Sequence, residues 1–141
     1  MQPGNPQTTY MSFAQPWLFV MLGSALGGGA RLWLTTAVAR PLGTAFPWGT
    51  LAVNLLGCLA VGILAALLAP PGRMHDTQSL RVFLIVGVLG GFTTFSAFAL
   101  DALLLVQRGS PVAAAAYVAA SVIGCLLAAG AAYALVSAAL R

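Results

Sequence analysis

Four apolar segments make up most of this chain, and each is long enough to cross a lipid bilayer as a helix. They run over Phe13–Val38, Trp48–Leu68, Leu80–Val106 and Pro111–Leu140, and a spanning helix needs about 20 apolar residues. Only 6% of the residues are charged, against about 25% in a soluble domain. The sequence therefore predicts an all-α membrane protein in which residues 13–141 form a single domain of four transmembrane helices.

The residues before the first apolar segment have a different character. Residues 1–12 are mostly polar, carry no charged side chain and lack the positive start of a signal peptide. We expect them to form a disordered N-terminal tail. The turns between the segments are short and rich in proline and glycine, so no soluble domain is expected.

The third apolar segment contains a sequence that disfavours a continuous helix. Residues 90–94 read Gly-Gly-Phe-Thr-Thr. Glycine costs a helix interior roughly 1 kcal/mol, and threonine is β-branched. Irregular backbone persists in a membrane only where it is buried in protein or lines a polar cavity. We therefore predict that the third helix is broken here and that the break handles ions.

The arginines are divided evenly between the two predicted sides of the membrane. One side would hold Arg73, Arg81 and Arg141, and the other would hold Arg31, Arg40 and Arg108. The positive-inside rule then favours neither orientation. Either the orientation is weakly specified, or the protein inserts in both orientations and pairs antiparallel.

Few polar side chains fall inside the apolar segments. Asn54 needs hydrogen-bond partners in lipid, either as a link between helices or as a donor that lines an ion path. Arg31 and Asp101 lie near helix ends, where a charge is a functional candidate but a long side chain can also reach the interface; for Asp101 we favour a structural or vestibule role. Cys58 and Cys125 form no CxxC motif and have no nearby His, which favours small buried hydrophobic residues over a metal or redox site.

Two aromatic rings follow the predicted break directly. Phe95 and Phe98 are three residues apart and share one helix face; they could be simple packing residues. An aromatic ring also has a positive edge, so two rings beside a narrow path could stabilise a small anion without a fixed positive charge that would hold it too tightly. Hydroxyl donors could be added by Thr94, Ser96, Tyr117 and Ser121.

These residues together resemble the Fluc family of fluoride channels, also called CrcB. The resemblance extends from about Val20 to Arg141. It includes a glycine-rich first helix that ends in Arg31, the run Gly49–Gly57, which contains Asn54, and the run Gly90–Phe98. Tyr117 and Ser121 on the fourth helix also match.

The resemblance implies passive fluoride export across the inner cell membrane through an antiparallel homodimer with two pathways. Phe95 and Phe98 resemble the phenylalanines that line these pathways, and Asn54 resembles the pore amide. Tyr117 and Ser121 resemble a polar track on the fourth helix; Ser96 is a further candidate for the pathway.

The resemblance also implies two features outside the pathways. A structural sodium ion would lie at the dimer centre, held by main-chain carbonyls of Gly90 and Thr93. Arg31 resembles the vestibule arginine of the family. The sequence departs from the family pattern in four places, where Thr, Ser, Glu and Ser are replaced by Ala97, Ala99, Asp101 and Cys125.

Other classes of protein fit the sequence less well. A small multidrug transporter is also a four-helix antiparallel dimer, but it needs a carboxylate within the membrane, and this first helix has none. A non-transporting scaffold would not explain a break flanked by Phe, Thr and Ser. No constellation of His, Cys or paired carboxylates suggests an enzyme, and no basic patch suggests nucleic-acid binding.

Overall fold

The computed structural model describes residues 14–69 and 78–141, and their regular structure is entirely helical. The bounds along the chain are α1 (Ala14–Leu42), α2 (Trp48–Leu68), α3 (Gln78–Arg81), a π-helix (Val82–Leu89), α4 (Gly90–Phe92), α5 (Phe95–Gln107) and α6 (Pro111–Ala139). Four candidate membrane spans result, because α3 to α5 together form the span Gln78–Gln107. This confirms the prediction of an all-helical protein with four spans. The predicted tail, residues 1–12, lies outside the described residues.

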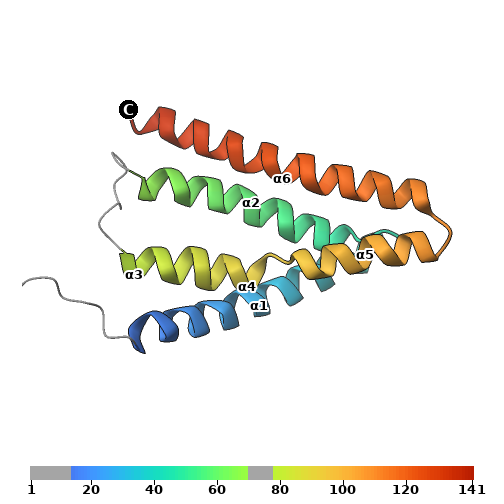
Figure 1. The fold of residues 1–141 in the computed structure, drawn as a ribbon, viewed down its shortest axis with the longest axis horizontal. Coiled ribbons are helices and arrows are strands. Elements are labelled where there is room, and N and C mark those ends of the chain that lie inside the picture. The colour runs from blue at the N-terminus through green and yellow to red at the C-terminus, as the bar shows by residue number, and fades with distance from the viewer. Residues whose placement is uncertain (1–13, 70–77) are drawn as a thin grey trace, which may run out of the picture.

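The four spans lie roughly side by side, with α1 crossing the third span (Figure 1). The most extensive helix packing is between α2 and α6. Helix α1 packs on the π-helix and α4, and α5 packs on α6. Helix α1 approaches the third span so closely that a Cβ on Gly91 would lie 2.6 Å from the Ser24 carbonyl oxygen. Glycine at this position therefore allows the backbones of α1 and α4 to touch.

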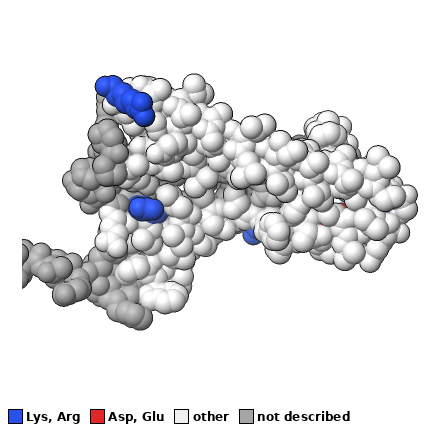
Figure 2. All heavy atoms as spheres, turned by 45° about the horizontal axis from the view of Figure 1, so that its top comes forward, with Lys and Arg blue, Asp and Glu red and all other residues white. Residues whose placement is uncertain are grey.

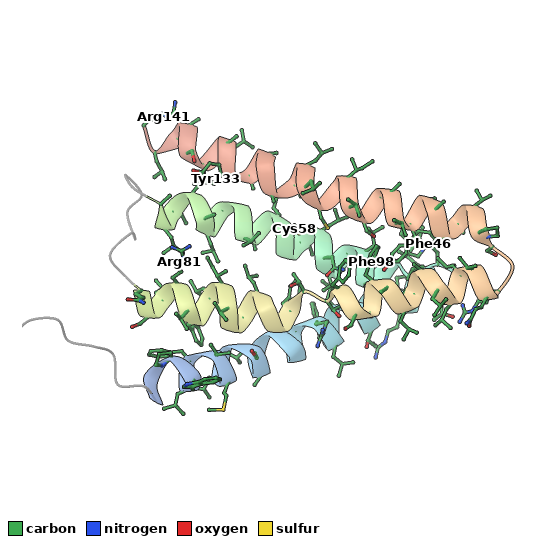
Figure 3. The ribbon with its side chains drawn as sticks, in the orientation of Figure 1. Phe46, Cys58, Arg81, Phe98, Tyr133 and Arg141 are labelled. Carbon is green, nitrogen blue, oxygen red and sulfur yellow. The ribbon has the colours of Figure 1, made fainter. Side chains whose placement is uncertain are left out.

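The outer surface is suited to lipid. Large apolar side chains point outward, among them Leu32, Trp33 and Leu135, which are 70–73% exposed. On the face shown in Figure 2, charged atoms occupy only small areas. Arg81 and Arg141 lie at the same end of the bundle (Figure 3). An apolar belt with charges near its ends is typical of a protein that crosses a membrane.

The π-helix that precedes the break was not predicted from the sequence. Residues Val82–Leu89 form a π-helix, a rare geometry that is frequent near functional sites. Its backbone is held against α1, since the Ser24 hydroxyl donates to the Gly87 carbonyl oxygen over 3.4 Å. The eight residues are ordinary apolar ones plus one glycine, so nothing in their sequence distinguishes them from a regular helix.

Candidate functional site

The helical backbone of the third span is interrupted at Thr93 and Thr94. Both residues have extended conformations, with ψ of 156° and 113°. The Thr93 hydroxyl donates to the Leu89 carbonyl at 2.9 Å, and the Thr94 hydroxyl oxygen accepts from the Ala97 N–H at 3.2 Å. The first threonine thus ends one helical piece, and the second caps the next as an N-cap residue.

A single side chain from α2 holds this extended backbone. The Asn54 Oδ1 atom accepts from the Thr94 N–H at 2.8 Å, and Asn54 Nδ2 donates to the Thr94 carbonyl at 3.1 Å. The amide therefore pairs with the break as a neighbouring strand would. One N–H of Nδ2 is left over, because a primary amide has two.

The same hydrogen bonds leave carbonyl groups free of their helical donors. In a continuous α-helix the N–H of residue i bonds to the carbonyl of residue i−4, so Thr94 would donate to Gly90 and Ala97 to Thr93. Here the Thr94 N–H goes to Asn54 and the Ala97 N–H goes to the Thr94 hydroxyl. The carbonyls of Gly90 and Thr93 thus lose the partners that a regular helix would supply.

Beside the break is a groove of about 320 Å³, which we call the break groove. It contains four of the predicted pathway residues, Asn54, Phe95, Phe98 and Ser121. The full lining is Asn54, Cys58, Thr93, Thr94, Phe95, Phe98, Ser121, Val122, Cys125 and Leu126. Most of this lining is apolar carbon, and none of its side chains is an arginine or a carboxylate.

A row of aromatic rings leads from the break groove to the α1–α2 turn. The ring centroids are 5.3 Å apart for Phe95 and Phe98, 5.4 Å for Phe98 and Tyr117, 5.6 Å for Tyr117 and Phe46, and 4.5 Å for Phe46 and Trp48. Phe98 and Tyr117 are buried, whereas Phe95 is 79% exposed. The sequence reasoning missed Phe46; its position just before Pro47 and the second span was the available signal.

Ser121 on α6 is the unusual polar group of the break groove. Its side chain is 5% exposed, and its hydroxyl oxygen has no hydrogen-bond partner among the described residues. A buried polar group without a partner costs about 1–3 kcal/mol. The Tyr117 hydroxyl lies near this oxygen but donates to Asp101, so the Ser121 hydroxyl is a donor available to a ligand in the groove.

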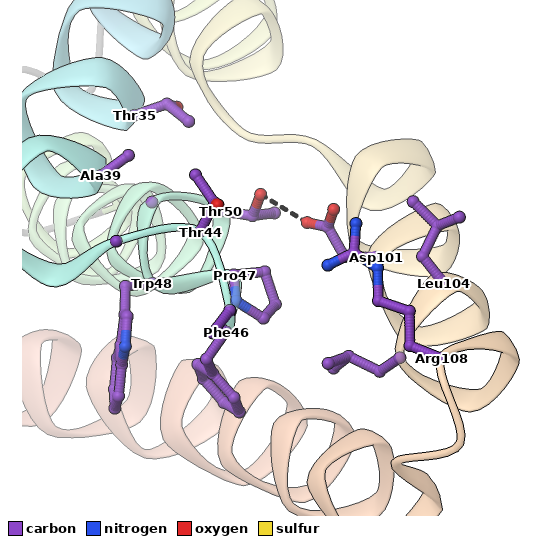
Figure 4. A pocket seen from close by; sticks show the side chains of 14 residues that line it. Thr35, Ala39, Thr44, Phe46, Pro47, Trp48, Thr50, Asp101, Leu104 and Arg108 are labelled. Atoms are coloured by element: carbon purple, nitrogen blue, oxygen red, sulfur yellow. Dashed lines mark hydrogen bonds between the residues drawn. The ribbon is translucent and has the colours of Figure 1, made fainter.

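A second polar cluster lies nearer the end of the bundle. The Thr50 hydroxyl donates to Asp101 Oδ2 at 2.7 Å, and the Tyr117 hydroxyl donates to the same oxygen at 3.4 Å. A cavity of about 270 Å³ opens beside them, with Arg108 on its wall (Figure 4). Thr50 was not singled out from the sequence, although it lies one helical turn before Asn54 and so shares its face.

Four predicted residues do not line the break groove: Tyr117, which contacts Asp101 instead, and Arg31, Ser96 and Gly90. Arg31 is half-buried on α1, and the structure places it on the wall of neither cavity described above. Ser96 is exposed, with its hydroxyl 3.3 Å from that of Thr94. Gly90 is exposed, and a Cβ there would meet no atom closer than 3.8 Å.

Comparisons with known proteins agree on one family. The family model for the CrcB-like protein, Camphor Resistance (CrcB), matches residues 18–133. A Chelativorans protein is 52% identical over 111 residues, which cover 79% of this chain and 87% of the relative. A Rhizobium etli protein is 52% identical over 103 residues, which cover 73% of this chain and 81% of the relative. A Methylocella silvestris protein is 45% identical over 112 residues, 79% and 86% of the two chains.

All three relatives are named "Fluoride-specific ion channel FluC". They are channels rather than enzymes, and their family agrees with the resemblance seen in the sequence. The four apolar spans together with this match make the chain a multi-pass membrane protein. With the family model covering most of the chain and relatives near 50% identity, this protein belongs to the CrcB family.

Proposed function

We propose that this protein is a fluoride channel that lets fluoride leave the cell passively and so lowers its cytoplasmic concentration. The names of its relatives support this function. The observation in the structure that carries it is the Ser121 hydroxyl, which is buried in the break groove without a partner. A small, strongly accepting anion is the ligand that such a donor suits.

The chemistry around Ser121 favours passage over tight binding. Phe95 and Phe98 line the same groove, and ring edges carry partial positive charge. The spare N–H of Asn54 is a further donor. A site built from partial charges stabilises a dehydrated anion while letting it leave, which conduction requires.

The remaining candidates are assigned to the path and to its mouth. We place Ser96 and Tyr117 along the polar path and Arg31 at its mouth. The Tyr117 hydroxyl donates to Asp101, so its contribution to the path is to hold Phe98 through their ring contact. Asp101 and Thr50 anchor this tyrosine from the vestibule side.

The proposed functional unit is an antiparallel homodimer. Phe95 lines the break groove yet is 79% exposed in the single chain, so the groove is open on the side where a second copy would close it. Arginines at both ends of the bundle, such as Arg81 and Arg108, are compatible with insertion in either orientation. A two-fold axis would then form two equivalent pathways.

A sodium ion at the centre of this dimer is part of the proposal. The carbonyls of Gly90 and Thr93 are freed by the hydrogen bonds of Asn54 and Thr94, and carbonyls of unwound helices are a known type of sodium ligand. Sodium bound there would fix the two breaks against each other. Replacing sodium with N-methylglucamine should lower the thermal stability of the dimer, and equal stability in both salts would contradict the site.

Replacing the unpartnered hydroxyl tests the proposed route. Ser121→Ala removes a buried donor that makes no hydrogen bond among the described residues, so the fold should be at least as stable as before. We expect fluoride efflux from liposomes to fall at least about tenfold, equivalent to about 1.4 kcal/mol in the barrier. Ser137→Ala, on the same helix but outside the groove, is the matched control. Equal efflux in both variants would remove Ser121 from the route.

A further inference from the structure

Two cysteines from different helices meet in the break groove. Cys58 on α2 lies one helical turn after Asn54, and Cys125 on α6 lies one turn after Ser121, so each thiol continues a polar face of its helix. Both line the groove, and both are half-buried and free of disulfides. The packing of α2 on α6 brings the two cysteines into this one groove, and Figure 3 shows Cys58 on α2.

The composition of this thiol pair limits what it could bind. No cluster of three or more His, Cys, Asp or Glu side chains that could hold a metal ion occurs among the described residues, so a four-ligand zinc site is not available. Thiolates select soft cations, and soft monovalent ions accept two ligands. The pair therefore matches a cation such as silver(I) or copper(I).

We propose that Cys58 and Cys125 form a two-thiolate site for one soft monovalent cation inside the anion groove. On binding, both S–H bonds break and their protons leave to water, while two metal–sulfur bonds form and no electron is transferred. Metal binding supplies the free energy for deprotonation. Two thiolates and one monovalent cation leave a net charge of −1 beside Asn54 and Ser121.

This charge gives the site a consequence for conduction, which rests on the proposed function. A negative group near a path of low dielectric repels an approaching anion strongly. The bound ion also fills part of a groove of only about 320 Å³. Soft cations should therefore block fluoride passage.

Silver nitrate in chloride-free buffer is the probe for binding to the detergent-solubilised full-length protein. Bound silver is measured by equilibrium dialysis, and thiolate coordination by ultraviolet absorbance. The wild type should bind one silver ion per subunit with a thiolate signal. Cys58→Ser and Cys125→Ser should each lose affinity at least a hundredfold, and the double variant should give no thiolate signal.

The single variants separate a shared site from two independent thiols. If each single variant still binds silver as tightly as the wild type, or if the wild type binds two ions per subunit, the shared site is wrong. Both cysteines would then be small packing residues. This result does not depend on whether the protein conducts fluoride.

A flux measurement decides whether the two-thiolate site lies on the route that fluoride takes. Fluoride efflux from liposomes is recorded with and without silver, and each variant is normalised to its own silver-free rate. Silver should reduce wild-type efflux at least tenfold and leave the double variant unaffected. If both cysteines bind one silver ion but efflux is unchanged, the proposed block of fluoride passage is wrong. If the wild type shows no fluoride efflux even without silver, that result counts against the proposed function alone.

Discussion

The hydrogen bonds between Asn54 and the backbone of the break offer the most informative perturbation. Asn54→Leu keeps a side chain of similar size but removes both bonds to Thr94, which are 2.8 and 3.1 Å long. The Thr94 N–H and carbonyl would each lose a partner, at about 1–3 kcal/mol per group. The sum, about 2–6 kcal/mol, is a large fraction of the stability of a typical domain.

The structure also indicates how the chain would relieve this loss. Without Asn54, the Thr94 N–H can return to the Gly90 carbonyl and extend α4 through the break. That rearrangement recovers one hydrogen bond but removes a proposed sodium ligand and turns Phe95 away from its present position. We therefore expect a measurable loss of stability and an almost complete loss of fluoride efflux.

The assay combines thermal unfolding, size-exclusion chromatography and fluoride efflux from liposomes. Thr36→Val is the control, because the Thr36 hydroxyl is exposed and bonds only within its own helix, to the Leu32 carbonyl at 2.8 Å. Asn54→Asp separates charge from hydrogen bonding, since it keeps an acceptor for the Thr94 N–H but adds a charge that repels anions. Wild-type stability and efflux in Asn54→Leu would refute the role assigned to this amide.

Three further predictions address the rings, the close packing at the break and the orientation. Phe95→Ile and Phe98→Ile should each reduce fluoride efflux at least tenfold while the dimer stays folded, because Ile keeps the apolar bulk but lacks a positive ring edge; wild-type efflux in both would make the rings packing residues. Gly57→Ala should destabilise the protein by about 1–3 kcal/mol, since its Cβ would overlap a threonine methyl at the break. Gly130→Ala, whose Cβ meets no atom within 4 Å, should leave the stability unchanged or raise it by up to about 1 kcal/mol; equal melting temperatures of the two variants would contradict this. Ser110→Cys, in a chain without native cysteines, should react with an impermeant maleimide from both sides of the membrane, and labelling from one side only would exclude dual insertion.

The four spans and the position of the break could be predicted because both depend on local sequence. Span length follows from the run of apolar residues, and two glycines followed by two threonines disfavour a helix wherever they occur. Thr93 and Thr94 indeed have extended backbone. The family resemblance rested on the same local runs and was confirmed by the family match.

The partners of the polar side chains could not be predicted, because they depend on the register between helices. The position of Asn54 in the sequence left a link between helices and an ion-path donor equally open, and only the packing of α2 on the third span brings it to Thr94. Cys58 and Cys125 are far apart in the sequence, and the α2–α6 contact places them in one groove. Such contacts arise from tertiary packing, which leaves no local signal.

Selective fluoride conduction by this protein is tested directly by fluoride efflux from liposomes that contain the purified wild-type protein. A fluoride electrode records release under a fluoride gradient in sodium-containing buffer, and a chloride electrode records the same experiment with chloride. We expect fluoride release well above that of protein-free liposomes, with chloride release at the protein-free rate. Fluoride release no faster than from protein-free liposomes, or equal release of both anions, would contradict it.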